Sequence, residues 1–169
     1  MEQLGIPFQV RMPDVEELAS GPPHEVAVEN AYRKASAVAQ EGVCALGVDT
    51  VVALGATLYG KPADRGQARA TLEALSGRRH VVIGGLCLIS GDGRPRTAAA
   101  TTAVQFRALD EHLLEWYLAS GEWRERAGAY AIQGRGAALV AAIEGDYLNV
   151  VGLPVGLLLE MVPGLLGSV

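Results

Sequence analysis

The hydrophobic positions of this chain fall into short apolar runs separated by amphipathic stretches. The run at residues 43–54 is rich in β-branched residues and predicts a strand buried on both faces. Two further runs, at residues 81–90 and 97–106, flank the turn Gly91-Asp92-Gly93 and predict a long hairpin. Shorter strands are expected at residues 6–12, 56–59 and 137–143.

Amphipathic stretches predict the helices that pack on these strands. In residues 25–40, small apolar residues recur at helical spacing and form one narrow stripe. Lys34 falls inside that stripe, so its side chain either runs along the surface to water or reaches into a cleft to meet an anion. Asp64, Asp110 and Pro154 mark the starts of three more helices, the last at residues 155–161. The helix after Asp110 is expected to direct toward the core Leu113, Leu114, Trp116, Tyr117 and Leu118.

Length and composition indicate one globular domain. The chain has 169 residues, 50% of them hydrophobic, which is enough for a core without a disulfide or a metal. The net charge is −5 and the basic residues are scattered, so no nucleic-acid partner is expected. No apolar run is long enough to span a membrane, and the N-terminus lacks the features of a signal peptide. We therefore expect a cytoplasmic protein without a membrane partner.

The cysteines and histidines do not form a metal-binding pattern. Cys44 and Cys87 lie far apart in apolar runs, which predicts buried free thiols in a reducing compartment. His24, His80 and His112 are too dispersed for a zinc site, and each is expected at the surface or at a helix cap.

One carboxylate stands in the middle of the central apolar run. A buried, unpaired carboxylate is costly, so Asp49 should have a cation, a metal or a set of amide donors as its partner. The alternative is a structural aspartate that ends the strand and caps the next turn.

Three further segments carry polar groups that suit either a ligand or plain surface. The acidic turn at residues 13–17 is typical of a solvated loop. Residues 126–136 combine three glycines with an aromatic and an amide side chain, which fits a loop around a flat polar ligand and equally an ordinary surface loop. Residues 55–61 match the glycine and lysine positions of a P-loop, but Pro62 stands where that motif needs a hydroxyl group, so we reject it.

Six short motifs follow one another along the chain. They are 47–52 (Gly-Val-Asp-Thr-Val-Val), 60–62 (Gly-Lys-Pro), 75–77 (Leu-Ser-Gly) with His80, 104–107 (Val-Gln-Phe-Arg), 127–130 (Ala-Gly-Ala-Tyr) with 132–134 (Ile-Gln-Gly), and 147–154 (Tyr-Leu-Asn-Val-Val-Gly-Leu-Pro). Together these motifs resemble the Maf family of nucleoside triphosphate pyrophosphatases, from about Leu4 to the C-terminus.

The resemblance implies both a fold and an activity. The implied fold is α/β, a single domain with a mixed central β-sheet flanked by helices and a Maf/ITPase-like two-lobed cleft. The implied reaction hydrolyses a nucleoside triphosphate at the α–β phosphoanhydride linkage, giving the monophosphate and diphosphate. The implied cofactor is a divalent metal cation, Mg²⁺ or Mn²⁺, and the implied partner is the nucleoside triphosphate substrate.

Carried over position by position, the resemblance also implies roles for individual residues. Thr50 and Gln133 match the family members that prefer dTTP and UTP, and the Gln133 amide can pair with a pyrimidine edge. The implied sites are Asp49 as the catalytic carboxylate, Glu17 and Asp49 as metal ligands, and Lys34, Lys61, Thr50 and Gln133 as substrate-binding residues.

The match departs from the family at its N-terminal side. Family members open with a strand and a Ser-rich loop bearing paired arginines, so residues 1–169 are expected to form a single Maf-like domain that is N-terminally truncated relative to the family. The pair Arg78-Arg79 lies in another motif and cannot take that role. Either the start has been assigned too late, or the chain is a truncated relative with weak or no catalysis.

These departures leave two alternatives to an active enzyme. One is a catalytically impaired nucleotide-binding protein that acts in the control of cell division and septum formation. The other is a plain nucleotide-binding module, which a ligand would stabilise without turnover. The sequence does not fix the oligomeric state, and a homodimer is compatible with it.

Overall fold

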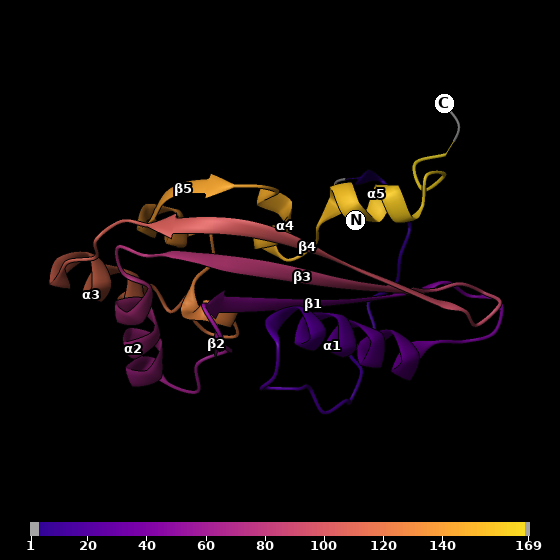
Figure 1. Cartoon of the computed structure of the whole chain (residues 1–169), viewed down its shortest axis with the longest axis horizontal. Helices are drawn as coiled ribbons and strands as arrows, with labels where there is room; N and C mark the ends of the chain where they lie inside the picture. Colours follow the sequence, from indigo (N-terminus) through magenta and orange to yellow (C-terminus); the bar gives the residue numbers. More distant parts are fainter. Residues whose placement is uncertain (1–3, 168–169) are drawn as a thin grey trace.

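A five-stranded antiparallel sheet runs the length of the molecule in the computed structural model, which describes residues 4–167 (Figure 1). The strand order is β2-β1-β3-β4-β5. The strands are β1 (Ala45–Leu54), β2 (Thr57–Tyr59), β3 (Arg79–Ile89), β4 (Pro95–Phe106) and β5 (Val140–Glu144).

The α/β class and the three long strands are confirmed, whereas the expectation of a mixed sheet is wrong. All the strand pairings within residues 4–167 are antiparallel. Tight turns join β1 to β2 and β3 to β4, and both connections reverse the chain. The strand expected at residues 137–143 begins only at Val140, because residues 135–139 form a 3-10 helix.

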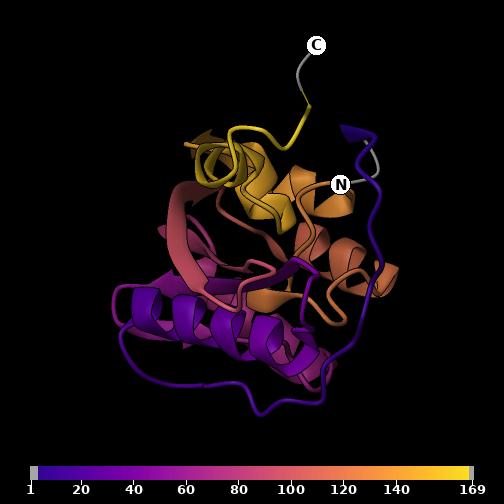
Figure 2. The same ribbon diagram turned by 90° about the vertical axis from the view of Figure 1, so that its right-hand side faces the viewer.

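The strand expected at residues 6–12 is also wrong. This segment is extended but belongs to none of the described strands. Pro7 has no backbone donor for a ladder, and Phe8, Val10 and Met12 are exposed. Figure 2 shows the segment crossing one edge of the sheet, from the side of α5 (Val155–Met161) to the side of α1 (Pro23–Val38).

The helices begin where the capping residues predict. The carboxylate of Asp64 accepts a hydrogen bond from Gln67 N at the start of α2 (Arg65–Leu75), and Asp110 accepts one from Leu113 N at the start of α3 (Glu111–Ser120). Within α3, Trp116 is exposed rather than buried, and the Arg135 guanidinium lies over its ring. The sequence did not predict α4 (Tyr147–Val151) or the 3-10 turn Ala127–Ala129.

Helix α1 lies unusually close to the sheet, on the face opposite α4 and α5 (Figure 2). A Cβ at Gly47 of β1 would overlap the carbonyl oxygen of Ala31, and one at Gly85 of β3 would overlap that of Ala27. Glycine on the sheet and alanine on the helix therefore let the two backbones touch. This approach brings short polar side chains of α1 within reach of β1.

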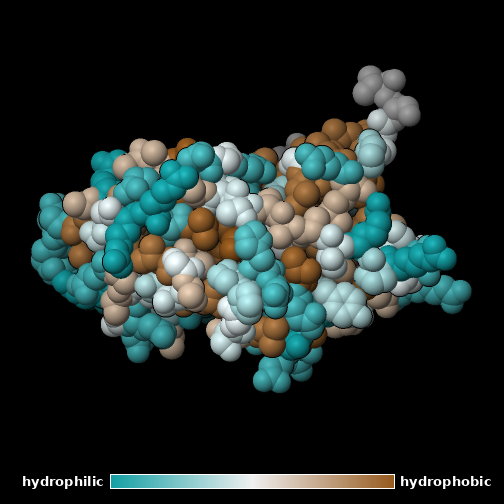
Figure 3. Space-filling model, in the orientation of Figure 1, coloured by the Kyte–Doolittle hydropathy of each residue, from teal (hydrophilic) through white to brown (hydrophobic). Residues whose placement is uncertain are grey.

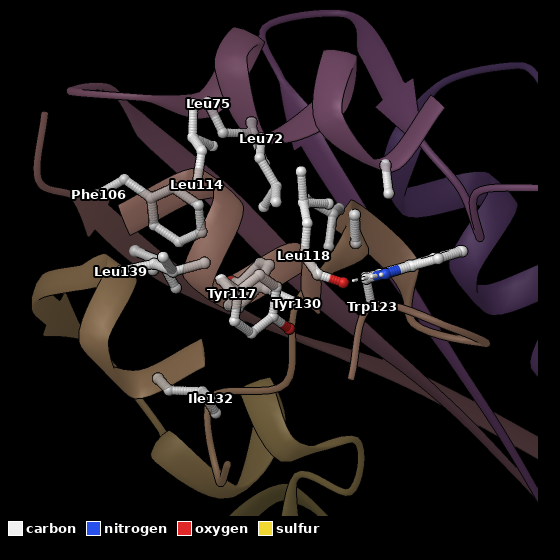
Figure 4. Packing of buried hydrophobic residues seen from close by; sticks show 14 of the residues in the cluster. Leu72, Leu75, Phe106, Leu114, Tyr117, Leu118, Trp123, Tyr130, Ile132 and Leu139 are labelled. Atoms are coloured by element: carbon white, nitrogen blue, oxygen red, sulfur yellow. Dashed lines mark hydrogen bonds between the residues drawn. The ribbon is translucent and has the colours of Figure 1, made fainter. Parts of the chain in front are cut away.

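The largest apolar cluster fills the end of the sheet covered by α2 and α3. Figure 4 shows its aromatic and leucine side chains, with Trp123 Nε1 donating to the Leu118 carbonyl at 3.1 Å. The rings of His80, Phe106 and Tyr130 pack edge to face, with centroids 4.9–5.6 Å apart. The expectation that His80 lies at the surface is therefore wrong.

The surface is mostly polar at the α2–α3 end, where hydrophilic side chains predominate (Figure 3). Of the two cysteines, Cys87 is buried as expected, whereas Cys44, just before β1, is exposed and the expectation that it is buried is wrong. None of the helices in residues 4–167 has the length and hydropathy needed to cross a bilayer.

Candidate functional site

A cavity of about 460 Å³ opens where β1 loses its neighbour on one side. β2 pairs with β1 only at Val52–Leu54, so within the described chain residues 45–51 have β3 on one side and no strand on the other. The cavity lies between two groups of elements: α1 with the acidic segment (residues 13–19), and the loop at residues 125–133 with α4. The residues predicted from the sequence all line it, namely Glu17, Lys34, Asp49, Thr50, Lys61 and Gln133.

Asp49 points from β1 toward α1 and is only 7% exposed. Its Oδ1 accepts a hydrogen bond from Lys34 Nζ at 2.5 Å, and its Oδ2 accepts one from Asn30 Nδ2 at 3.3 Å. The strand continues to Leu54, so the alternative of an aspartate that ends the strand is wrong. The partner that a buried carboxylate requires is a lysine together with an amide donor.

Lys34 joins the two predicted acidic residues. Its Nζ also lies 2.9 Å from a carboxylate oxygen of Glu17, and its side chain is 21% exposed. Burial lowers the pKa of Lys34, but the hydrogen bonds and charges of Asp49 and Glu17 outweigh burial and raise it above its ordinary value. Lys34 therefore reaches into a cleft, as one of the two sequence interpretations held, and stays charged at neutral pH.

The carboxylate oxygens around Lys34 Nζ are of the kind that bind divalent cations. Glu17 and Asp49 both place an oxygen against one ammonium nitrogen, so the carboxylates converge on a single positive charge. Residues 4–167 contain no cluster of three or more histidine, cysteine or acidic side chains suited to a metal. Two carboxylates fit Mg²⁺ or Mn²⁺ when phosphate oxygens and water complete the coordination, as is common in nucleotide enzymes.

The loop at residues 125–133 forms the opposite wall. Gly128 and Ala129 have φ of 69° and 60°, a left-handed conformation that folds the loop tightly against β1. The buried Tyr130 hydroxyl lies 3.0 Å from His80 Nε2, which fixes the loop from behind. Gln133 follows as an exposed side chain in the cavity wall, so the loop faces a cavity rather than plain surface.

Lys61 stands at the mouth of the cavity. Its side chain is 55% exposed, and its Nζ lies 3.8 Å from the Glu125 carboxylate. This contact is long and solvated, so it holds the ammonium group only weakly. Lys61 is therefore free to move toward an anion in the cavity.

Thr50 lines the cavity from the face of β1 opposite Asp49, and α4 covers that side. Asn149 of α4 is fully buried and donates to Val82 O at 3.0 Å and to Thr102 Oγ1 at 3.0 Å. These bonds place Gly152 in the cavity wall near Thr50. Residues 147–154 form one of the sequence motifs, but the sequence did not predict the role of Asn149, because that role depends on contacts with two distant strands.

Asn30 is the site residue that sequence reasoning missed. It is 2% exposed and contacts both Asp49 and the backbone of Leu18. A signal was present, because Asn30 precedes Lys34 by four residues and so shares its face of the helix.

Comparison with known proteins agrees with the arrangement of motifs. A family model described as "Maf-like protein" matches residues 1–165. A protein named dTTP/UTP pyrophosphatase from Symbiobacterium thermophilum is 45% identical over 165 residues, 95% of this chain and 84% of that protein. Proteins with the same name are 45% identical in Pyrococcus furiosus, over 83% of this chain and 74% of that protein, and 46% identical in Myxococcus xanthus, over 92% and 81%.

Proposed function

The chain belongs to the Maf family, and from this premise we propose that it is a nucleoside triphosphate pyrophosphatase that acts on pyrimidine nucleotides. Relatives named dTTP/UTP pyrophosphatase match most of its length. The observation that carries the proposal is the buried Asp49 carboxylate, held by Lys34 and Asn30 in the wall of a cavity of about 460 Å³. We further propose that the bond cleaved is the α–β phosphoanhydride, as in a nucleotide diphosphatase.

In this mechanism, Asp49 acts on the attacking water. Water adds to a phosphorus of the α–β linkage, and the bridging P–O bond breaks with its electron pair on the departing oxygen. The products are the nucleoside monophosphate and inorganic diphosphate. Asp49 accepts a proton from the water and orients the lone pair of the water oxygen toward the phosphorus. It thus acts as a general base that neighbouring hydrogen bonds hold in place. Lys34 remains charged and can stabilise negative charge that develops on the phosphate oxygens.

The remaining predicted residues bind the substrate. Lys61, exposed at the mouth, can follow the triphosphate as it enters. Gln133 presents an amide donor and acceptor to a pyrimidine edge, and Thr50 offers a hydroxyl group on the other side of the cavity. Glu17 and Asp49 would hold Mg²⁺ or Mn²⁺, which when bound supplies charge neutralisation at the triphosphate.

The test is release of diphosphate from UTP, dTTP, CTP and GTP with Mg²⁺, for the chain and for Asp49→Asn. The substitution keeps the shape of the side chain and removes its charge. We expect turnover of UTP and dTTP above that of CTP and GTP, with Asp49→Asn reduced by at least about a hundredfold. Full turnover by Asp49→Asn would refute the role of Asp49.

A folded chain that hydrolyses no nucleotide would refute the proposed pyrophosphatase activity. Nucleotide binding without turnover, seen as a rise in melting temperature with UTP, would then support the impaired binding protein or the plain binding module.

A further inference from the structure

The acidic segment (residues 13–19) carries Glu17 into the site without belonging to a helix or a strand. Lys34 of α1 contacts the Glu17 carboxylate at 2.9 Å, and two further side chains of α1 hold the backbone of the segment, one on each side of Glu17. Arg33 Nη1 donates to Glu16 O at 2.9 Å. Asn30 Oδ1 accepts from Leu18 N at 2.7 Å, and Asn30 Nδ2 donates to Leu18 O at 3.1 Å.

The Asn30 amide thus binds Leu18 as a neighbouring strand would, through both its N–H and its C=O. The second hydrogen of Asn30 Nδ2 goes to Asp49 Oδ2 at 3.3 Å. One buried side chain therefore contacts the segment that carries Glu17 and also the carboxylate of Asp49. Lys34, one turn later, contacts the other oxygen of Asp49.

The two side chains that hydrogen-bond to the backbone of the segment, Arg33 and Asn30, differ in burial. Arg33 is half-buried and also pairs with Glu29 at 2.8 Å, so water can replace its bond to Glu16. Asn30 is 2% exposed, and without its amide the Leu18 backbone and Asp49 Oδ2 would lose their partner inside the protein. Asn30 should therefore dominate the placement of the segment.

The geometry points to Asn30 as a positioning residue that sets Glu17 and Asp49 relative to each other. The inference has a structural half, the placement of Glu17 and Asp49, and a catalytic half, the effect of that placement on turnover. The catalytic half rests on the proposed function. Asn30 does not touch the reacting atoms. It fixes the orientation of the Asp49 carboxylate directly, and it fixes Glu17 through the backbone of the adjoining residue.

Two substitutions separate these two roles. Asn30→Leu keeps the branching of the side chain, with two methyl groups in place of the amide oxygen and nitrogen, and removes all three hydrogen bonds. Asn30→Asp keeps an acceptor for Leu18 N but loses both donors and places a second carboxylate beside Asp49. Asn149→Leu is the matched control, because it removes another buried asparagine amide, on the opposite face of the sheet.

The first readout is hydrogen exchange of the Leu18 amide, with cleavage after Glu16 or Glu17 by a glutamate-specific protease. We expect Asn30→Leu to speed both exchange and cleavage by roughly tenfold or more. In Asn30→Asp the Leu18 amide should exchange more slowly than in Asn30→Leu. Asn149→Leu should leave exchange and cleavage at residues 13–19 unchanged. The second readout is UTP hydrolysis. In both Asn30 variants, kcat should fall roughly tenfold or more while KM changes less.

Native exchange at Leu18 in a folded Asn30→Leu would overturn the structural half of the inference. Native kcat in both Asn30 variants would overturn the catalytic half. A wild-type chain that hydrolyses no nucleotide would refute the proposed function and the catalytic half with it, while exchange and cleavage would still decide whether Asn30 holds the segment. If Asn30→Leu does not fold, the kcat of Asn30→Asp decides.

Discussion

Replacing Lys34 by methionine tests the charge balance of the site directly. Lys34 Nζ contacts Asp49 at 2.5 Å and Glu17 at 2.9 Å, so the variant leaves two carboxylates facing one another without a cation. Removing one partner of a fully buried ion pair costs about 3–5 kcal/mol. The side chain of Lys34 is 21% exposed and that of Glu17 43%, so water screens part of the repulsion between the two carboxylates. We therefore expect the free energy of unfolding to fall by roughly 1–3 kcal/mol.

The loss should be measured as the free energy of unfolding in urea and as the melting temperature. A loss of 2 kcal/mol corresponds to roughly 4–8 °C for a chain of this size. Lys61→Met is the control, because Lys61 is 55% exposed and its pair with Glu125 is 3.8 Å long, so its removal should change stability by about 0–1 kcal/mol.

The pH dependence has a defined sign. The pKa of Lys34 is raised in the folded state, so its contribution is complete below the pKa of an unfolded lysine and is lost as pH rises through the folded pKa. The difference between wild type and Lys34→Met should therefore not diminish on going from neutral pH up to the pKa of an ordinary lysine, and should shrink only in stronger alkali.

Divalent cations provide a second readout. The ammonium group occupies the place where both carboxylates converge, so it competes with a metal in the absence of nucleotide. Mn²⁺ alone should raise the melting temperature of Lys34→Met more than that of the wild type. Equal stabilities of Lys34→Met and Lys61→Met, with no difference in the response to Mn²⁺, would refute the reasoning.

Three further substitutions test the scaffold. Gly47→Ala places a methyl group against the Ala31 carbonyl and should cost roughly 1–3 kcal/mol in urea unfolding; an unchanged midpoint would contradict the close approach of α1. Burial lowers the pKa of His80 to about 4, so the unfolded chain binds its proton first and stability falls by up to ~3 kcal/mol as pH drops from about 6.5 to 4. His80→Phe should flatten that part of the pH curve, and a curve parallel to the wild type would exclude His80 as its source. Asp64→Ala removes the cap on Gln67 N and should lower stability by about 1 kcal/mol, whereas no change in the melting temperature would show the cap to be dispensable.

The features that the sequence predicted are those decided by local chemistry. The β-branched run of β1, the turn between β3 and β4, and the caps of α2 and α3 depend on residues a few positions apart. The helical face of Lys34 also followed from local periodicity, which placed it toward the sheet but left open whether its side chain runs to water or enters a cleft. The need of Asp49 for a partner followed from the cost of burying its charge.

The features that the sequence missed depend on residues that meet only after folding. Asn30 gained its role because the acidic segment and β1 both pass within hydrogen-bond reach of α1. His80 is buried because Tyr130 and Phe106, from two other elements, close around it. The segment at residues 6–12 alternates like a strand but belongs to none of the described strands, although β1 has, in the described chain, an unpaired edge at residues 45–51. Pairing depends on how two segments meet and is not a property of one segment.

The contact between α1 and the sheet also decides which parts of the molecule can move. Where Gly47 and Gly85 let the backbones touch, there is no layer of side chains across which the helix could slide. Asn30, Lys34 and Asp49 therefore belong to one stiff body whose geometry exists before any substrate arrives. Relaxation measurements should therefore find no slow exchange in α1, because any motion of the helix would have to carry β1 and β3 with it.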